Sequence, residues 1–255
     1  MLKFFLTLLL TLSTSCQLNV KKKRLAENYH QISVSLIKKC DHNRALRHLL
    51  KGVKLDKNNF LIRYTLAVNY FTIKDYHLAI QELKKVLKQN SKVTEARVTL
   101  ARSYLEIGNV EKALEQIKVA EKDQTYPYPL KVMALKGMAH FKQADFLQAR
   151  REFKEVLSVP KSENCFSSLY LGRTEMEIKN YEESEKILKR AVQTCSNEEA
   201  LCSPKNYNAH FFLAQLYLHQ KLKKKAAYHL KIFLKQASSK NPYLLQAKKL
   251  LKQTL

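Results

Sequence analysis

The chain has 255 residues with only 4 Gly and 5 Pro and no Trp, which is too little turn chemistry for an all-β fold. Its 46 Lys and Arg outnumber 22 Asp and Glu, and the net charge of +24 suits a nucleic acid, an anionic membrane surface or an acidic partner. A solvated face of Lys-rich helices is the alternative reading of this charge. Strong helix formers dominate the composition, so we expect an all-α protein.

Residues 1–15 have the pattern of an export signal. Lys3 precedes an apolar run over residues 4–12, and Ser13, Thr14 and Ser15 lead into Cys16. The apolar run is roughly half of the 18 or so residues that a bilayer-spanning helix needs. We therefore expect a signal peptide and no lasting transmembrane helix.

The segment Ser13-Thr14-Ser15-Cys16 resembles the lipobox of bacterial lipoproteins, although Ser13 stands where that motif prefers leucine. The resemblance implies that Cys16 is lipidated and that residues 16–25 form a lipidated linker. Gln17 follows the cysteine, which by the sorting rule of that family implies the periplasmic face of an outer membrane. The alternative is an ordinary signal peptide with a chance cysteine.

The central part of the chain repeats itself. Ala45, Ala79 and Ala113 lie 34 residues apart, and the pattern Leu-Ala-x-x-Tyr recurs at 66–70 and 100–104. This period and pattern resemble the tetratricopeptide repeat, which implies a solenoid of stacked helical hairpins. We place a C-terminal capping helix at residues 241–255. The six repeats before it are expected at residues 26–59, 60–93, 94–127, 130–163, 165–198 and 207–240.

Side-chain size supports this register. Small residues at paired positions, such as Ala67 with Ala79, would let the two helices of a hairpin approach closely. Large residues such as Tyr70 and Tyr104 would fill the space before the next hairpin. The later repeats are spaced more widely, so we expect extra turn residues at 126–128 and around 196–205.

The tetratricopeptide resemblance also implies a partner-binding groove, lined by positions 2, 5, 9, 12 and 13 of each repeat. The residues at these positions form a largely apolar stripe that would suit an amphipathic helix or an extended protein segment. The alternative is that several of them pack on neighbouring repeats. The candidate groove residues are Leu61, Tyr64, Val68, Phe71, Val98, Arg102, Leu105, Ala134, Met138, Phe141, Phe166 and Leu169.

No catalytic, metal-binding or cofactor-binding motif is found in the sequence. The eight histidines are scattered without metal-ligand spacing, and four glycines can hardly supply a nucleotide-binding loop. Gly-aromatic RNA-binding and recognition-helix signatures are also lacking, so we do not expect nucleic acid as the partner. We expect a protein that is not an enzyme and needs no cofactor.

Four further cysteines would meet an oxidising compartment after export. Cys195 and Cys202 bracket the long turn before the sixth repeat, and Cys165 begins the fifth repeat near the end of its second helix. We expect a disulfide among these three, with the pairing open. Cys40 is expected to stay a buried thiol.

The segment Asp123-Gln124-Thr125-Tyr126-Pro127-Tyr128-Pro129 follows the third repeat. Together with the lipobox and the six repeats, it resembles the PilF/PilW-type lipoproteins of type IV pilus biogenesis, the pilotins of the pilus secretin. That resemblance implies an outer-membrane lipoprotein that binds secretin subunits and promotes their targeting and multimerisation. The alternatives are an envelope scaffold for outer-membrane protein or peptidoglycan machinery, and a basic solenoid that binds an anionic polymer.

Overall fold

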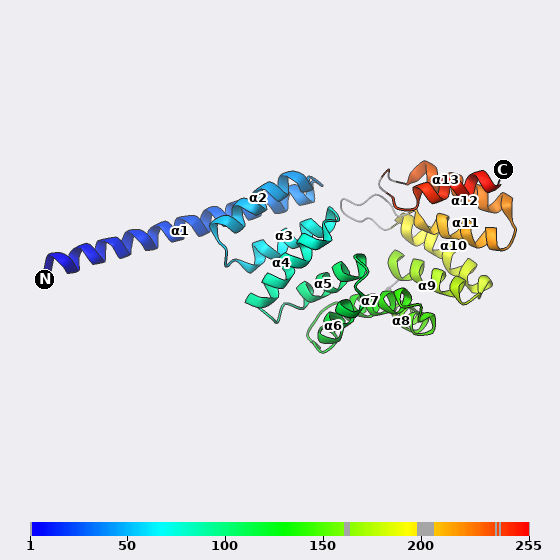
Figure 1. The fold of residues 1–255 in the computed structure, drawn as a ribbon, viewed down its shortest axis with the longest axis horizontal. Helices are drawn as coiled ribbons and strands as arrows, with labels where there is room; N and C mark the ends of the chain where they lie inside the picture. The colour runs from blue at the N-terminus through cyan, green and yellow to red at the C-terminus, as the bar shows by residue number, and fades with distance from the viewer. Residues whose placement is uncertain (1, 161–163, 198–206, 238, 240, 255) are drawn as a thin grey trace. The chain divides into compact units, whose positions relative to one another are not determined.

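The computed structural model describes residues 2–160, 164–197, 207–237, 239 and 241–254, with side chains from residue 19 onward except at 196 and 197. Thirteen helices are found in these residues, and they pack as consecutive hairpins (Figure 1). No other type of regular element occurs in the part of the chain so described. The expected all-α fold class is therefore confirmed.

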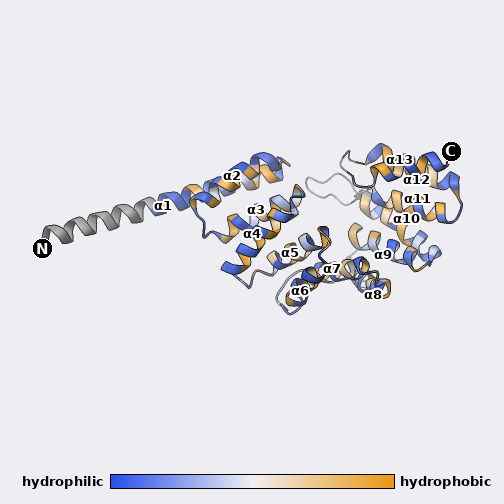
Figure 2. Ribbon diagram, in the orientation of Figure 1, coloured by the Kyte–Doolittle hydropathy of each residue, from blue (hydrophilic) through white to orange (hydrophobic). Residues whose placement is uncertain are grey.

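The chain divides into two compact units, 1–120 and 121–255. The first unit holds three hairpins, formed by α1 (Leu2–Lys38), α2 (His42–Leu55), α3 (Phe60–Thr72), α4 (Tyr76–Gln89), α5 (Thr94–Glu106) and α6 (Val110–Ala120). The second holds three more hairpins and a last helix, formed by α7 (Pro129–Lys142), α8 (Phe146–Ser158), α9 (Cys165–Glu177), α10 (Tyr181–Asn197), α11 (Asn208–His219), α12 (Lys223–Gln236) and α13 (Leu244–Thr254). In Figure 2 most of these helices carry both polar and apolar bands, as expected of helices buried on one side.

Every hairpin turns through one residue in the left-handed region. Each of these residues lies two positions after the last residue of the first helix, and their φ angles range from 59° to 82°. The next residue closes the turn by donating its N–H to a carbonyl five positions back, as Asp75 does to Tyr70 (2.9 Å) and Asn109 does to Tyr104 (2.9 Å). The six turn residues are Cys40, Lys74, Gly108, Ala144, Lys179 and Lys221.

A short acidic or amide side chain then starts the second helix in most hairpins. Asp41 accepts the N–H of Arg44 at 3.0 Å, and Asn109 accepts that of Lys112 at 3.2 Å. Such N-caps satisfy backbone donors that the first turn of a helix leaves free. The left-handed residue and the N-cap together fix the sharp reversal between the two helices.

Small residues lie where the paired helices cross. Ala67 and Ala79 are both fully buried, and so are Ala101 and Ala113. In the fifth hairpin the space is tighter still, because a Cβ added to Gly172 would meet Leu188 at 2.6 Å. Larger side chains fill the space towards the next hairpin, and these tyrosines are at least 92% buried: Tyr70, Tyr104 and Tyr217.

The junction after the third hairpin is packed rather than loose. Tyr126 is buried and meets Tyr128 edge to face, with ring centroids 5.8 Å apart, before α7 begins at Pro129. The second expected insertion, around 196–205, lies mostly outside the described residues. At the C-terminus α13 covers the sixth hairpin through Ala247, which is fully buried, while Tyr243 just before it stacks on Phe211 (4.8 Å).

Helix α1 runs without a break from Leu2 to Lys38 and so includes the expected signal segment. Among the described residues, no helix combines the length and the apolar character that crossing a membrane would require. Export, cleavage and lipidation at Cys16 stay predictions.

The expectation for Cys40 is wrong. Its side chain is exposed and its sulfur is disulfide-bonded, so it is not a buried thiol. The reason is its place in the first hairpin turn: Cys40 takes the left-handed position (φ 65°), which directs its side chain away from the packed faces of α1 and α2.

Candidate functional site

In the first unit, the first helices of successive hairpins present a half-exposed apolar face. We call it the first-unit face; it consists of Leu61, Tyr64, Val68, Phe71 and Arg102. Leu61 is 48% exposed, which is high for a leucine in a packed array. Burial raises the pKa of Tyr64, and a hydrogen bond with the Thr99 side chain opposes that shift.

Arg102 caps this face. Its guanidinium carbon lies 4.9 Å from the centre of the Phe71 ring, in a cation–π arrangement that joins α5 to α3. Arg102 is exposed, so its guanidinium keeps N–H donors within reach of a partner beside the ring. The face therefore combines apolar surface with hydrogen-bond donors that suit a carboxylate or a carbonyl.

The second unit repeats this arrangement in a larger form. Arg173 stands over three aromatic rings, those of Phe141 (4.6 Å), Tyr170 (5.1 Å) and Phe212 (4.5 Å). These rings come from α7, α9 and α11, so one guanidinium joins the first helices of three hairpins. We call Phe141, Phe166, Tyr170 and Arg173 the second-unit face; Phe166 and Tyr170 pack at 4.8 Å.

The structure divides the twelve candidate groove residues into two groups. Seven keep exposed surface: Leu61, Tyr64, Val68, Phe71, Arg102, Phe141 and Phe166. The other five are at least 92% buried and pack within the array: Val98, Leu105, Ala134, Met138 and Leu169. The continuous apolar stripe is thus interrupted, because several of its members fill the space between neighbouring first helices. Whether the accessible residues bind a partner stays a prediction.

Sequence reasoning missed that Arg102 and Arg173 each lie over an aromatic ring of the preceding hairpin. Phe71 and Phe141 both hold position 12 of a repeat, and Arg102 and Arg173 both hold position 9 of the repeat that follows. This spacing was visible in the sequence, but its meaning depends on which side chains meet across two helices. Tyr170 and Phe212 carried no such signal.

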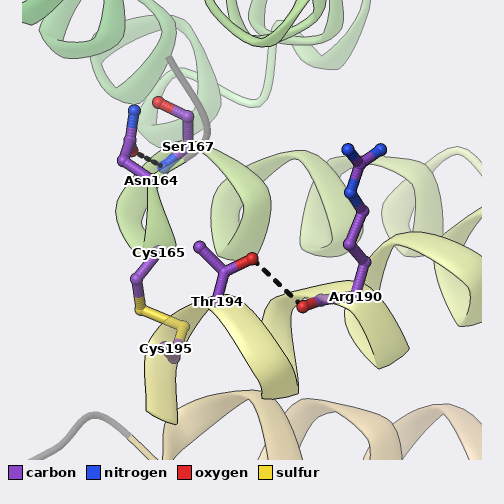
Figure 3. Close-up of a disulfide and its surroundings, with 6 residues drawn as sticks. All are labelled: Asn164, Cys165, Ser167, Arg190, Thr194 and Cys195. Carbon is purple, nitrogen blue, oxygen red and sulfur yellow. Dashed lines mark hydrogen bonds between the residues drawn. A yellow bond between two sulfur atoms is a disulfide. The ribbon is translucent and has the colours of Figure 1, made fainter. Parts of the chain in front are cut away.

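A disulfide joins Cys165, at the start of α9, to Cys195, near the end of α10 (Figure 3). The Cα atoms are 4.6 Å apart and the cysteines are separated by 30 residues. Both cysteines are buried against the sixth hairpin. The third candidate, Cys202, lies outside the described residues.

Two histidines of the sixth hairpin share one hydrogen bond. The Nδ1 atoms of His210 and His229 are 2.8 Å apart, so one ring must donate and the other accept. Burial lowers the pKa of both rings, and that of His229 falls to about 4, helped by the charges of His210 and Lys189 and opposed by Glu185. Protonating both rings would break the bond.

This pair predicts acid sensitivity of the second unit. A histidine in the unfolded chain titrates near 6.5, whereas folded His229 stays neutral down to a pH of about 4. Between these pH values the unfolded state binds one more proton than the folded state, so the free energy of unfolding falls as the pH drops from 6.5 towards 4. Allowing for partial exposure, we expect a loss of about 1–2 kcal/mol from this ring. Urea unfolding at neutral pH and near pH 4 should show a smaller loss for His229→Gln than for the wild type. An identical loss in both would contradict the assignment.

Among the described residues, no group of three or more His, Cys, Asp and Glu side chains is arranged to hold a metal ion.

Two tetratricopeptide-repeat family models match the sequence, one over residues 73–135 and the other over 171–242. Together they cover more than half of the 255 residues. No curated protein sequence matches the chain.

Many solved structures resemble the fold. One chain of the APC/C hetero-tetramer Cut9–Hcn1 matches with a TM-score of 0.74 and 17% identity over 93% of this chain, which spans only 46% of that one. PilF of Pseudomonas aeruginosa matches with a TM-score of 0.63 and 16% identity, over 90% of this chain and 99% of PilF. PilW, a type IV pilus biogenesis factor, matches with a TM-score of 0.69 and 15% identity, over 88% of this chain and 98% of PilW. Likeness at these identities shows the fold alone.

Proposed function

The chain belongs to the tetratricopeptide-repeat family, and from that premise we propose that it is a non-catalytic lipoprotein that binds secretin subunits of a type IV pilus. It would be anchored through Cys16 to the periplasmic face of the outer membrane and promote the assembly of the secretin ring. Repeats of this family provide protein-binding scaffolds. The finer assignment is supported by the lipobox resemblance and by the likeness to PilF and PilW over nearly their whole length.

The observation that carries the binding role is the first-unit face. It offers partly exposed apolar surface at Phe71 and Tyr64, bordered by the exposed guanidinium of Arg102. A bound amphipathic segment would cover the rings and place a carboxylate or carbonyl on the guanidinium. Arginine and aromatic residues in such positions often dominate the energetics of protein interfaces.

The test is charge reversal at Arg102. Arg102→Glu keeps a long, exposed side chain but repels an acidic group and loses the cation–π contact, so secretin capture in a pull-down should fall at least about tenfold. In a deletion strain, wild type should restore secretin multimers, whereas Arg102→Glu should leave the subunits monomeric. Loss of multimers with Cys16→Ser as well would support the lipid anchor.

The matched control is Lys88→Glu, which reverses one exposed charge on α4 within the same unit. It should capture secretin as the wild type does. Undiminished capture by Arg102→Glu would remove the first-unit face from the proposal. Normal secretin multimers in the deletion strain would remove the pilus assignment itself and favour a general envelope scaffold.

A further inference from the structure

The last two helices carry charge of one sign only. From residue 200 to the C-terminus the sequence contains eleven lysines and no Asp, Glu or Arg. Elsewhere some of the cations have acidic partners within reach, as Lys136 has in Glu121 (2.9 Å) and Lys189 has in Glu185 (2.7 Å). Among the described residues no ion pair is found for a lysine of α12 or α13.

Helical spacing gathers these lysines into two exposed stripes. On α12 the steps of four, three and four residues put one set on the side opposite the buried Ala226, Leu230 and Phe233. On α13 a second set lies opposite the buried Ala247. We call them together the lysine face; its members are all exposed and are Lys224, Tyr228, Lys231, Lys235, Leu245, Lys248, Lys249 and Lys252.

Each stripe also contains an apolar side chain that packing does not explain. Tyr228 is 63% exposed and Leu245 is 82% exposed, the latter the most exposed large hydrophobic residue among those described. Single exposed apolar residues also occur on solvated helices, but here they stand among lysines on both stripes, a combination that suits a face resting on lipid. Tyrosine suits the boundary between head groups and acyl chains, and lysine can extend its ammonium group back to the phosphates.

We propose that the lysine face docks on an anionic phospholipid surface and is a second membrane contact, independent of any lipid at the N-terminus and of the secretin-binding role. The all-lysine composition favours this occupant. Ammonium groups attract phosphates at a diffuse surface without the paired geometry that arginine supplies to a single carboxylate or a base. A single-stranded nucleic acid would call for stacked aromatic platforms, and the face has one tyrosine.

Vesicle binding of the full-length Cys16→Ser chain tests the proposal, because this chain cannot be acylated at that position. Binding to phosphatidylcholine vesicles measures the part that needs no anionic lipid. The increase in binding when phosphatidylglycerol is added measures the part that depends on anionic lipid. We expect the anionic lipid to raise binding strongly at low salt and less at high salt. Removing six charges of the face should lower that increase at least about tenfold; the substitutions are Lys→Gln at Lys224, Lys231, Lys235, Lys248, Lys249 and Lys252.

A matched control removes six exposed charges of the same kind from other helices and turns. It carries Lys→Gln at Lys84, Lys88, Lys92, Lys112, Lys118 and Lys122. It should keep most of the response to phosphatidylglycerol. An equal loss in both variants would overturn the proposal, since net charge alone would then explain the binding.

The absence of tryptophan from the sequence allows a direct reading of insertion. Tyr228→Trp should shift its fluorescence to the blue with phosphatidylglycerol vesicles, because the indole would leave water. Leu147→Trp, at a site on α8 that is 69% exposed, should not shift. No shift at Tyr228, with equally strong binding to soluble polyphosphate, would overturn the membrane proposal in favour of a polyanion.

Discussion

Replacing Cys165 and Cys195 together by alanine is expected to lower the free energy of unfolding of the second unit by about 2–4 kcal/mol. The bond closes a loop of 30 residues and joins the start of α9 to the end of α10. Without it the unfolded chain gains conformational entropy, while the folded hairpin keeps its other contacts. Chemical denaturation followed by circular dichroism measures the difference.

The control is Thr194→Ala, which changes the residue next to Cys195 (Figure 3). Thr194 lies at the partly exposed side of α10 and donates only to the carbonyl of Arg190, at 3.2 Å. We expect its loss to cost less than about 0.5 kcal/mol. Equal stability of the double alanine variant and the wild type would show that the bond adds nothing to the folded state.

The sequence was enough to predict the array of helical hairpins, because a 34-residue spacing of small residues has few other physical meanings. It was not enough to predict the turns. Lys74 and Lys179 take a left-handed conformation that favours glycine, and only Gly108 among the six turn residues carries that signal. The surrounding hydrogen bonds hold them there, with Asp75 and Asn180 each donating to a carbonyl five residues back. The backbone strain at each lysine is offset by hydrogen bonds of its neighbours, and the identity of the lysine alone does not reveal this.

The candidate site was predictable only in part for a similar reason. Repeat positions identify which side chains point towards the neighbouring first helices, but not how closely those helices pack. Leu105 is fully buried at the position where Phe71 and Phe141 keep exposed surface. Phe71 and Phe141 each lie beside an arginine of the following first helix, Arg102 and Arg173, and repeat positions alone do not predict such contacts.

The largest single-site effect is expected at Arg150, which partners a carboxylate sealed inside the second unit. Glu175 is fully buried and accepts hydrogen bonds from Arg150 Nε (2.8 Å) and Asn180 Nδ2 (2.9 Å), with Lys154 Nζ at 3.7 Å. Arg150→Met keeps most of the apolar stem but leaves the charge poorly compensated. Lys154 offers only a longer contact, so we expect a loss of about 3 kcal/mol in the free energy of unfolding, measured with urea.

Two further variants test whether the loss of stability in Arg150→Met comes from the unpaired buried charge or from lost packing. Arg151→Met removes the neighbouring cation, which is exposed, and should cost less than about 0.5 kcal/mol. Adding Glu175→Gln to Arg150→Met should recover part of the stability, because an amide is cheaper to bury without a cation and can still accept from Asn180. If the double variant is less stable than Arg150→Met, the buried charge is not the cause of the loss. Glu175 lies two residues from Arg173 on α9, so the ion pair also holds the helix that carries the second-unit face.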